Sequence, residues 1–375
     1  MRIAFIDLIG WDYTPRTPEV SPLGGTQSAV CYLARHLAAA GCEVSLLNRA
    51  ARAAPADGNS ADGVSVVPLT SADYPRALAA CDVAVMVSAA IDLAKLKAHL
   101  RPGVPLVLWT QHATDQSAVR PLAQSEVAAL VDHFVFVSRW QQAGYQQEFG
   151  LPVGRCHILR NAVSPAFAGM FADGRSALAA KTWPPRLAYT STPFRGLDIL
   201  LEVFPAIRAE VPGTTLEVYS SMQVYKLAAG RDSAEYGHLY QRAAATEGVE
   251  YVGSLPQGEL AEAMRGVALL AYPNTFAETS CIAVMEALAA GCRVVTSDWG
   301  ALAETTAGFA RLVPTGDVAT YRRQFTRAVV GVLREQASDP AAAQQHLDRQ
   351  LAHVEHECTW PRRAAQWIEW LATIV

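Results

Sequence analysis

Short apolar runs alternate with longer segments of helical period along almost the whole chain. The segment Gln27–Ala40 shows the helical pattern, because its apolar residues recur every three or four positions and Gly41 follows as a stop. Alternating strands and helices are typical of parallel α/β layers. In the first half we expect strands at Ile3–Leu8, Glu43–Leu47, Val64–Pro68, Val83–Val87, Leu106–Trp109, Phe134–Val137 and His157–Leu159.

A second alternating series begins near Arg186. Its expected strands are Leu187–Thr190, Leu216–Tyr219, Glu250–Val252, Leu269–Tyr272, Val294–Thr296 and Leu312–Val313. A chain of 375 residues is too long for one ordinary core, so two α/β domains with a cleft between them are predicted. We place the first domain at residues 1–165, a linker rich in glycine and proline at 166–185, and the second domain at 186–359. Residues 360–375, with three tryptophans, are predicted to form a docking helix.

Charge and cysteine usage narrow the class of protein. The net charge of −4 provides no basic footprint for nucleic acid, so no nucleic-acid partner is expected. Seven scattered cysteines without a Cys-x-x-Cys pair are typical of a reducing compartment. The apolar runs are too short to span a membrane, which favours a cytoplasmic protein. A mildly basic edge at Lys95–Arg101 suits weak peripheral contact with anionic lipid, although a solvated face is the favoured interpretation.

A predicted apolar helix in the second half carries one carboxylate and is preceded by another. Thr279 or Ser280 is expected to cap this helix and Gly291 to end it, and Glu286 is its only polar side chain from residue 281 to 290. A helix that is apolar all round is buried, so its carboxylate needs a partner such as a ribose diol. Free N–H groups at the helix start, near Glu278, suit a diphosphate. The alternative is a solvent-facing glutamate.

Two further loops follow predicted strands and precede helices. Gly24 and Gly25 follow the first strand and permit close approach of a diphosphate, although such a pair is more often a tight turn. The loop from Thr190 to Asp198 contains Thr192 and Arg195, and a cation there can neutralise a leaving diphosphate. A surface arginine is the rival interpretation of Arg195.

His112 comes directly after the strand that ends at Trp109. The carboxyl end of a parallel strand is where α/β proteins place ligand groups. A lone histidine is as often a hydrogen-bonded structural residue, so both interpretations of His112 stand.

The pair Glu278 and Glu286, separated by seven residues and followed by Ala-Leu-Ala-Ala-Gly, resembles the Glu-x7-Glu motif of family 4 retaining glycosyltransferases. The resemblance implies the GT-B fold, an α/β arrangement of two Rossmann-like domains facing each other across a cleft, with the last helix crossing back to the first domain. It implies that Glu278 contacts the donor sugar and Glu286 the ribose. Family members commonly carry two cations in the loop of Arg195, and this chain lacks the earlier one. The catalytic residues so assigned are His112, Arg195 and Glu278. The donor-binding residues are Gly24, Gly25, Thr192, Arg195, Thr279, Ser280, Cys281, Ile282 and Glu286.

The expected reaction is retaining transfer of a sugar from a nucleotide-diphosphate sugar to a hydroxyl of a glycan, a lipid-linked or another acceptor. Neither a metal nor a cofactor is expected, since no Asp-x-Asp follows a strand and no His/Cys cluster is present in the sequence. A glycoside hydrolase is disfavoured because its two acids flank one bond. A nicotinamide dehydrogenase is disfavoured because Gly-x-Gly-x-x-Gly is missing. A catalytically silent nucleotide-sugar sensor or scaffold on the same fold stays open.

Overall fold

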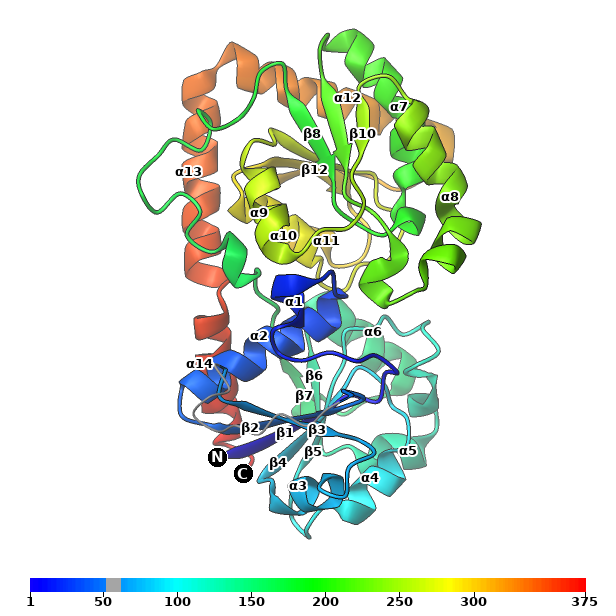
Figure 1. The fold of residues 1–375 in the computed structure, drawn as a ribbon, viewed down its shortest axis with the longest axis vertical. Helices are drawn as coiled ribbons and strands as arrows, with labels where there is room; N and C mark the ends of the chain where they lie inside the picture. Colours follow the sequence, from blue (N-terminus) through cyan, green and yellow to red (C-terminus); the bar gives the residue numbers. More distant parts are fainter. Residues whose placement is uncertain (52–61) are drawn as a thin grey trace. The chain divides into compact units, whose positions relative to one another are not determined.

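The computed structural model describes residues 1–51 and 62–375, which divide into two compact units (Figure 1). Unit 1 comprises Met1–Pro18, Gly25–Ala162 and Trp360–Val375, and unit 2 comprises Glu19–Gly24 and Val163–Thr359. The segment predicted as a linker lies in unit 2, where Phe167, Met170 and Phe171 belong to the apolar core. The C-terminal helix lies in unit 1.

Unit 1 is built on a parallel seven-stranded sheet in the order β3-β2-β1-β4-β5-β6-β7. Its strands are β1 (Arg2–Ile6), β2 (Glu43–Asn48), β3 (Val64–Pro68), β4 (Val83–Val87), β5 (Leu106–Trp109), β6 (His133–Phe136) and β7 (Cys156–Ile158). The central strands read as continuous apolar runs because helices cover both faces, and every residue of β4 and β5 is buried.

The helices of unit 1 connect consecutive strands, and the last one returns to the sheet from the far end of the sequence. They are α1 (Thr17–Val20), α2 (Gly25–Ala39), α3 (Tyr74–Ala80), α4 (Leu93–His99), η1 (Arg120–Ala123), α5 (Ser125–Leu130), α6 (Arg139–Phe149), η2 (Val153–Arg155) and α14 (Trp360–Leu371). In α14, the Trp360 ring lies 6.0 Å from Tyr32 of α2, and Trp367 lies 5.2 Å from Trp109 at the end of β5. Aromatic packing therefore holds α14 beside α2, as Figure 1 shows.

Unit 2 repeats the architecture with a parallel six-stranded sheet in the order β10-β9-β8-β11-β12-β13. Its strands are β8 (Arg186–Tyr189), β9 (Thr215–Val218), β10 (Val249–Tyr251), β11 (Leu269–Tyr272), β12 (Arg293–Ser297) and β13 (Ala310–Val313). Its helices are η3 (Pro165–Phe167), η4 (Pro193–Arg195), α7 (Leu197–Glu210), η5 (Met222–Tyr225), α8 (Ala229–Ala245), α9 (Gln257–Arg265), α10 (Ile282–Ala289), α11 (Leu302–Thr305), α12 (Val318–Ser338) and α13 (Pro340–Glu357).

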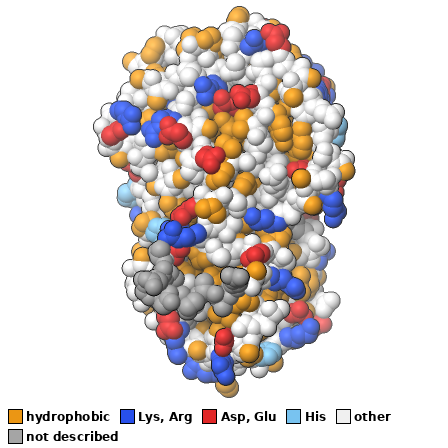
Figure 2. Space-filling model, in the orientation of Figure 1, with side chains coloured by type: hydrophobic (Ala, Val, Ile, Leu, Met, Phe, Trp, Pro, Cys, Tyr) orange, Lys and Arg blue, Asp and Glu red, His pale blue; other side chains and the backbone are white. Residues whose placement is uncertain are grey.

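Both units are Rossmann-like, which confirms the predicted fold class. In each sheet the chain adds two strands outward from the first and then returns to its other side, so the strand order reverses between β1 and β4 and between β8 and β11. On the face drawn in Figure 2, basic and acidic side chains are interspersed over each unit. The fold therefore offers two places, one per sheet, where a ligand site is expected beside the carboxyl ends of the strands.

Candidate active site

The loops after β8 and β11 meet where the strand order of unit 2 reverses. These strands are hydrogen-bonded neighbours, although two strands separate them in sequence. The loop after β8 carries Arg195, and the loop after β11 carries Glu278. Ligand sites of open α/β sheets form at such a reversal. Two residues predicted to be catalytic therefore lie at the topological position of a binding site.

A buried ion pair joins Arg195 to Glu278. The Nη1 atom of Arg195 donates to Oε1 of Glu278 at 2.7 Å, and the Tyr272 hydroxyl donates to the same oxygen at 2.6 Å. The guanidinium of Arg195 also lies 4.2 Å from the centre of the Phe276 ring. Burial acts to lower the pKa of Arg195, but Glu278 and the neighbouring Tyr225, Tyr272 and Cys281 together outweigh it, so the pKa is raised and the guanidinium stays charged. Arg195 is thus not a surface arginine.

Two glycines allow the backbone around this ion pair to pack closely. Gly196 has φ +109°, and a Cβ atom there would lie 2.1 Å from the carbonyl oxygen of Pro273. Gly300 has φ +69°, and its Cβ would lie 2.4 Å from the carbonyl oxygen of Glu278. That oxygen also accepts a hydrogen bond from the N–H of Ala301 at 2.6 Å. The backbone of Glu278 is therefore held by the loop that contains Gly300 and Ala301.

Tyr225, which the sequence interpretation missed, completes the cluster. Its hydroxyl accepts a hydrogen bond from Nη2 of Arg195 at 3.0 Å. A Cβ atom on Gly24, whose segment belongs to unit 2, would lie 3.2 Å from the Tyr225 ring. The structure thus brings three predicted residues, Gly24, Arg195 and Glu278, to one place through Tyr225. Tyr225 lies in η5, in the loop after β9. Its position after a predicted strand was the signal available in the sequence, because ligand groups lie at the carboxyl ends of parallel strands.

The helix that carries Glu286 begins later than predicted. Neither Thr279 nor Ser280 caps it: the N-cap is Cys281, without a side-chain hydrogen bond, and α10 starts at Ile282. The reason is the anchored backbone of Glu278, which keeps the following residues in the loop. The C-terminus is as predicted, since Gly291 has φ +65° and ends the helix.

Glu286 points into the interior of unit 2, as the apolar pattern predicts. It is 6% exposed, and its Oε1 accepts one long hydrogen bond, 3.4 Å from the N–H of Ser164. Burial raises the pKa of the Glu286 carboxyl to about 8, against 4.5 for an ordinary glutamate. The carboxyl is therefore short of donors, which two ribose hydroxyls supply chemically.

Thr192 is buried in the loop before Arg195. Its carbonyl accepts hydrogen bonds from the Tyr189 hydroxyl at 2.7 Å and from the N–H of Arg195 at 3.2 Å. Its own hydroxyl has no hydrogen-bond partner among the described residues. The backbone of Thr192, not its side chain, therefore shapes the turn that presents Arg195.

His112 lies in unit 1, in the loop after β5. Its Nδ1 contacts the Oε1 of Gln116, and its carbonyl accepts from Gln141 Nε2 at 2.8 Å and from the Tyr145 hydroxyl at 2.9 Å. Burial lowers the pKa of His112, and the contact with Gln116 offsets this only in part. The imidazole is thus a neutral hydrogen-bonding group near pH 7. Its backbone is fixed by buried partners.

Asp7 is a second residue that the sequence interpretation missed. It directly follows β1 and is buried, accepting hydrogen bonds from the Tyr13 hydroxyl at 2.7 Å, from Gln27 Nε2 at 3.0 Å and from the Ile9 N–H at 3.0 Å. Burial raises the pKa of Asp7, and these donors act in the opposite direction. An acid that ends the first apolar run was the signal available in the sequence. The predicted Gly25 is the first residue of α2 in the same unit.

Within residues 1–51 and 62–375, no three His, Cys, Asp or Glu side chains group as metal ligands would. In that same part of the chain, no helix is long and apolar enough to cross a bilayer.

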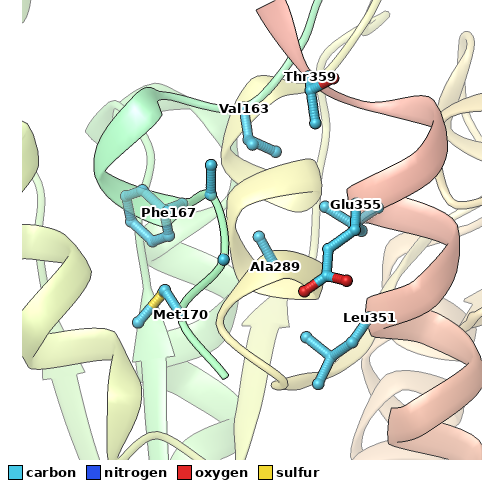
Figure 3. A pocket seen from close by; sticks show the side chains of 10 residues that line it. Val163, Phe167, Met170, Ala289, Leu351, Glu355 and Thr359 are labelled. Atoms are coloured by element: carbon cyan, nitrogen blue, oxygen red, sulfur yellow. The ribbon is translucent and has the colours of Figure 1, made fainter. Parts of the chain in front are cut away.

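A cavity of about 80 Å³ lies elsewhere in unit 2. Val163, Phe167 and Met170 line one side of it, and Leu351 and Glu355 of α13 line the other (Figure 3). None of the predicted site residues lines it, and its wall is mostly apolar. Because the ion pair and the buried glutamate lie outside this cavity, we do not assign the chemistry to it.

Comparison with known proteins identifies the family of the chain. Residues 185–334 match a family model described as glycosyl transferases group 1, and residues 23–167 match the model of glycosyltransferase family 4. A phosphatidyl-myo-inositol mannosyltransferase from Mycobacterium leprae is 28% identical over 175 residues, which are 44% of this chain and 43% of that relative. The match thus spans less than half of the relative's length.

Solved structures share the fold over the full chain. A sucrose-phosphate synthase from Thermosynechococcus elongatus has a TM-score of 0.69 at 17% identity, covering 100% of this chain and 98% of its own. Anabaena HepE in complex with UDP and glucose has a TM-score of 0.69 at 16% identity, covering 100% of both chains. With a glycosyltransferase model matched in each half of the sequence and two Rossmann-like units, the chain belongs to the family 4 glycosyltransferases and has the GT-B fold.

Proposed function

We propose that this protein is a retaining glycosyltransferase that moves a sugar from a nucleotide-diphosphate sugar to an acceptor hydroxyl without a metal ion. The observation that carries the proposal is the cluster of Arg195, Glu278 and Tyr225 at the strand-order reversal of unit 2. The cluster joins one fixed cation to one fixed carboxylate beside the start of α10. Diphosphates are bound by such cations and helix starts, and sugars by carboxylates.

Each part of the donor, namely ribose, diphosphate and sugar, is assigned to a group of this site. The ribose diol donates to the buried carboxyl of Glu286, which has a single long hydrogen bond in its place. The backbone N–H groups of Thr279–Ile282 and the guanidinium of Arg195 face the diphosphate. Glu278 accepts from the hydroxyls of the sugar.

The proposed transfer proceeds without a covalent enzyme intermediate. The bond from the anomeric carbon to the diphosphate oxygen breaks, and the acceptor oxygen bonds to that carbon from the same face. The departing phosphate oxygen takes the acceptor proton. Arg195 stabilises the charge that develops on the leaving group, an electrostatic contribution of several kcal/mol in comparable sites. His112, neutral near pH 7, serves on the acceptor side as a hydrogen-bonding group for the transferred sugar.

A thermal-shift series tests the donor site. UDP, GDP, ADP and CMP are added to the wild type and to Glu286→Ala, with UDP first because similar folds bind UDP and UDP-glucose. A nucleotide at 100 times its dissociation constant stabilises a fold by roughly 2.7 kcal/mol. A base-selective shift that Glu286→Ala abolishes supports the donor site. A well-folded wild type that no nucleoside diphosphate shifts would overturn it.

Product analysis tests the chemistry. With the matching donor and acceptor, NMR of the product should show the donor's anomeric configuration, and EDTA should leave the rate unchanged. Inversion at the anomeric carbon contradicts the retaining mechanism, and inhibition by EDTA contradicts metal independence. Nucleotide binding without turnover of any donor favours the silent sensor or scaffold instead.

A further inference from the structure

A second cation lies beside the candidate active site. Lys226 follows η5 directly and is exposed. Its Nζ contacts two neutral oxygens, Ser21 Oγ at 3.3 Å and the Pro22 carbonyl at 3.3 Å. Among the described residues, no carboxylate lies within ion-pair distance of it. Lys226 thus carries a positive charge that is weakly held and not neutralised.

The backbone fixes Lys226 relative to the ion pair. Its neighbour Tyr225 accepts the hydrogen bond from Arg195. The turn is closed by a hydrogen bond from the Lys226 N–H to the Gln223 carbonyl at 2.8 Å. Its start is held by the Ser221 hydroxyl, which accepts from the Gln223 N–H at 3.2 Å. The exposed Lys226 side chain therefore extends from a hydrogen-bonded turn next to the cluster.

The role of this cation follows from a comparison of the charge of the cluster with that of a diphosphate. Arg195 and Glu278 form a one-to-one pair, so the cluster is neutral before a ligand arrives. A diphosphate brings at least two negative charges to this edge of the sheet. Binding a dianion next to a buried carboxylate needs a further positive charge. Lys226 is a nearby cation whose partners are two neutral oxygens.

We propose that Lys226 leaves Ser21 and Pro22 when the donor binds and contacts the sugar-bearing phosphate of the diphosphate. There it neutralises the charge that grows on the leaving group as the bond to the sugar breaks. This inference rests on the proposed function, because it assigns a further catalytic residue to the same donor site. The ammonium acts as a point charge that the long side chain carries to the phosphate.

Calorimetric titration tests the assignment. The wild type, Lys226→Met, Lys226→Arg and the control Lys95→Met are each titrated with UDP, UMP and uridine, or with the corresponding series of whichever base binds. Lys226→Met should weaken the diphosphate by about tenfold or more and leave the nucleoside within about twofold, because a charged hydrogen bond is lost only at the outer phosphate. Lys226→Arg should stay within a few-fold of the wild type. Lys95 is exposed and paired with Asp92, so Lys95→Met should change nothing.

The outcomes separate the two proposals. Diphosphate binding by Lys226→Met as tight as that of the wild type overturns the role of Lys226 and leaves the proposed function intact. An equal loss for uridine and UDP also overturns it, since the residue would then act on the fold. A wild type that binds no nucleoside diphosphate overturns the proposed function, and the role of Lys226 with it. An unliganded melting temperature is measured for each variant to confirm folding.

Discussion

Replacing Glu286 by glutamine should stabilise the unliganded protein at alkaline pH. The carboxyl is 6% exposed and accepts one long hydrogen bond, and burial raises its pKa from 4.5 to about 8. Between these pH values the folded state binds a proton that the unfolded state has lost. The free energy of unfolding therefore falls as pH rises through this window. Glutamine carries no charge at any pH, so Glu286→Gln removes this dependence.

The magnitude follows from the size of the pKa shift. The difference between 4.5 and about 8, at roughly 1.4 kcal/mol per unit, sets a ceiling of roughly 5 kcal/mol at pH 8. Relaxation and water entry reduce this, and we expect about 3 kcal/mol. For a unit of this size, that corresponds to a rise in melting temperature of roughly 6–12 °C. At pH 5 both side chains are neutral in the folded state, and the difference should fall below about 1 kcal/mol.

Melting curves from pH 5 to 8 measure the effect. Glu355→Gln is the matched control, because Glu355 is an exposed carboxylate on α13 and its removal should leave the profile parallel to that of the wild type. Parallel profiles for the wild type and Glu286→Gln would falsify the buried, proton-binding carboxyl. The same carboxyl predicts that nucleotide binding near pH 7 releases a proton, since ribose hydroxyls favour its ionised form. Calorimetry in buffers of different ionisation enthalpy detects that proton, and Glu286→Gln should abolish it.

Three further substitutions test packing within the two units. Gly196→Ala should lower the free energy of unfolding in urea by more than about 3 kcal/mol, because its Cβ would lie 2.1 Å from a backbone oxygen. The control Gly258→Ala, in open space on α9, should be neutral or slightly stabilising. Equal effects of the two substitutions contradict the close approach at Gly196. Arg195→Met should destabilise the protein by about 3–5 kcal/mol by leaving Glu278 without its cation, and adding Glu278→Gln should restore much of it; additive losses refute the coupling. Trp367→Ala should cost about 3–5 kcal/mol through the cavity left under α14, and a loss below about 1 kcal/mol in thermal unfolding excludes that docking.

The hydrophobic pattern predicts the sheets well because most of their strands are short runs rich in apolar residues. Val64–Pro68, Val83–Val87, Leu106–Trp109 and Leu269–Tyr272 have the predicted bounds, and β6 begins one residue earlier than expected. The strands Val83–Val87, Leu106–Trp109 and Leu269–Tyr272 are buried on both faces and are continuous apolar runs, which few other structures accommodate. The order of the strands then fixes which loops meet, so Arg195 and Glu278 could be placed at one edge of one sheet from sequence.

The contacts between those loops could not be predicted in the same way. The hydrogen bond of Arg195 with Tyr225 and its ion pair with Glu278 join segments 30 and 83 residues apart. Neither periodicity nor capping preference encodes such a pairing. The predicted cap at Thr279 fails for the same reason, because Gly300 and Ala301, from another loop, anchor the residue before it. Tertiary anchoring overrides local helix signals here.

The ion pair explains how one arginine can serve a site that needs two positive charges. A lone buried guanidinium would have to remain charged without compensation when no donor is bound, at a cost of several kcal/mol. Glu278 removes that cost and, through its anchored backbone, holds the guanidinium in place. The neutral pair attracts an anion only weakly, so the net attraction for a diphosphate must come from outside the pair. An exposed lysine meets that need, because its charge is already hydrated and its neutral partners are lost at little cost. The buried residues thus set the geometry, and the exposed lysine supplies the net charge.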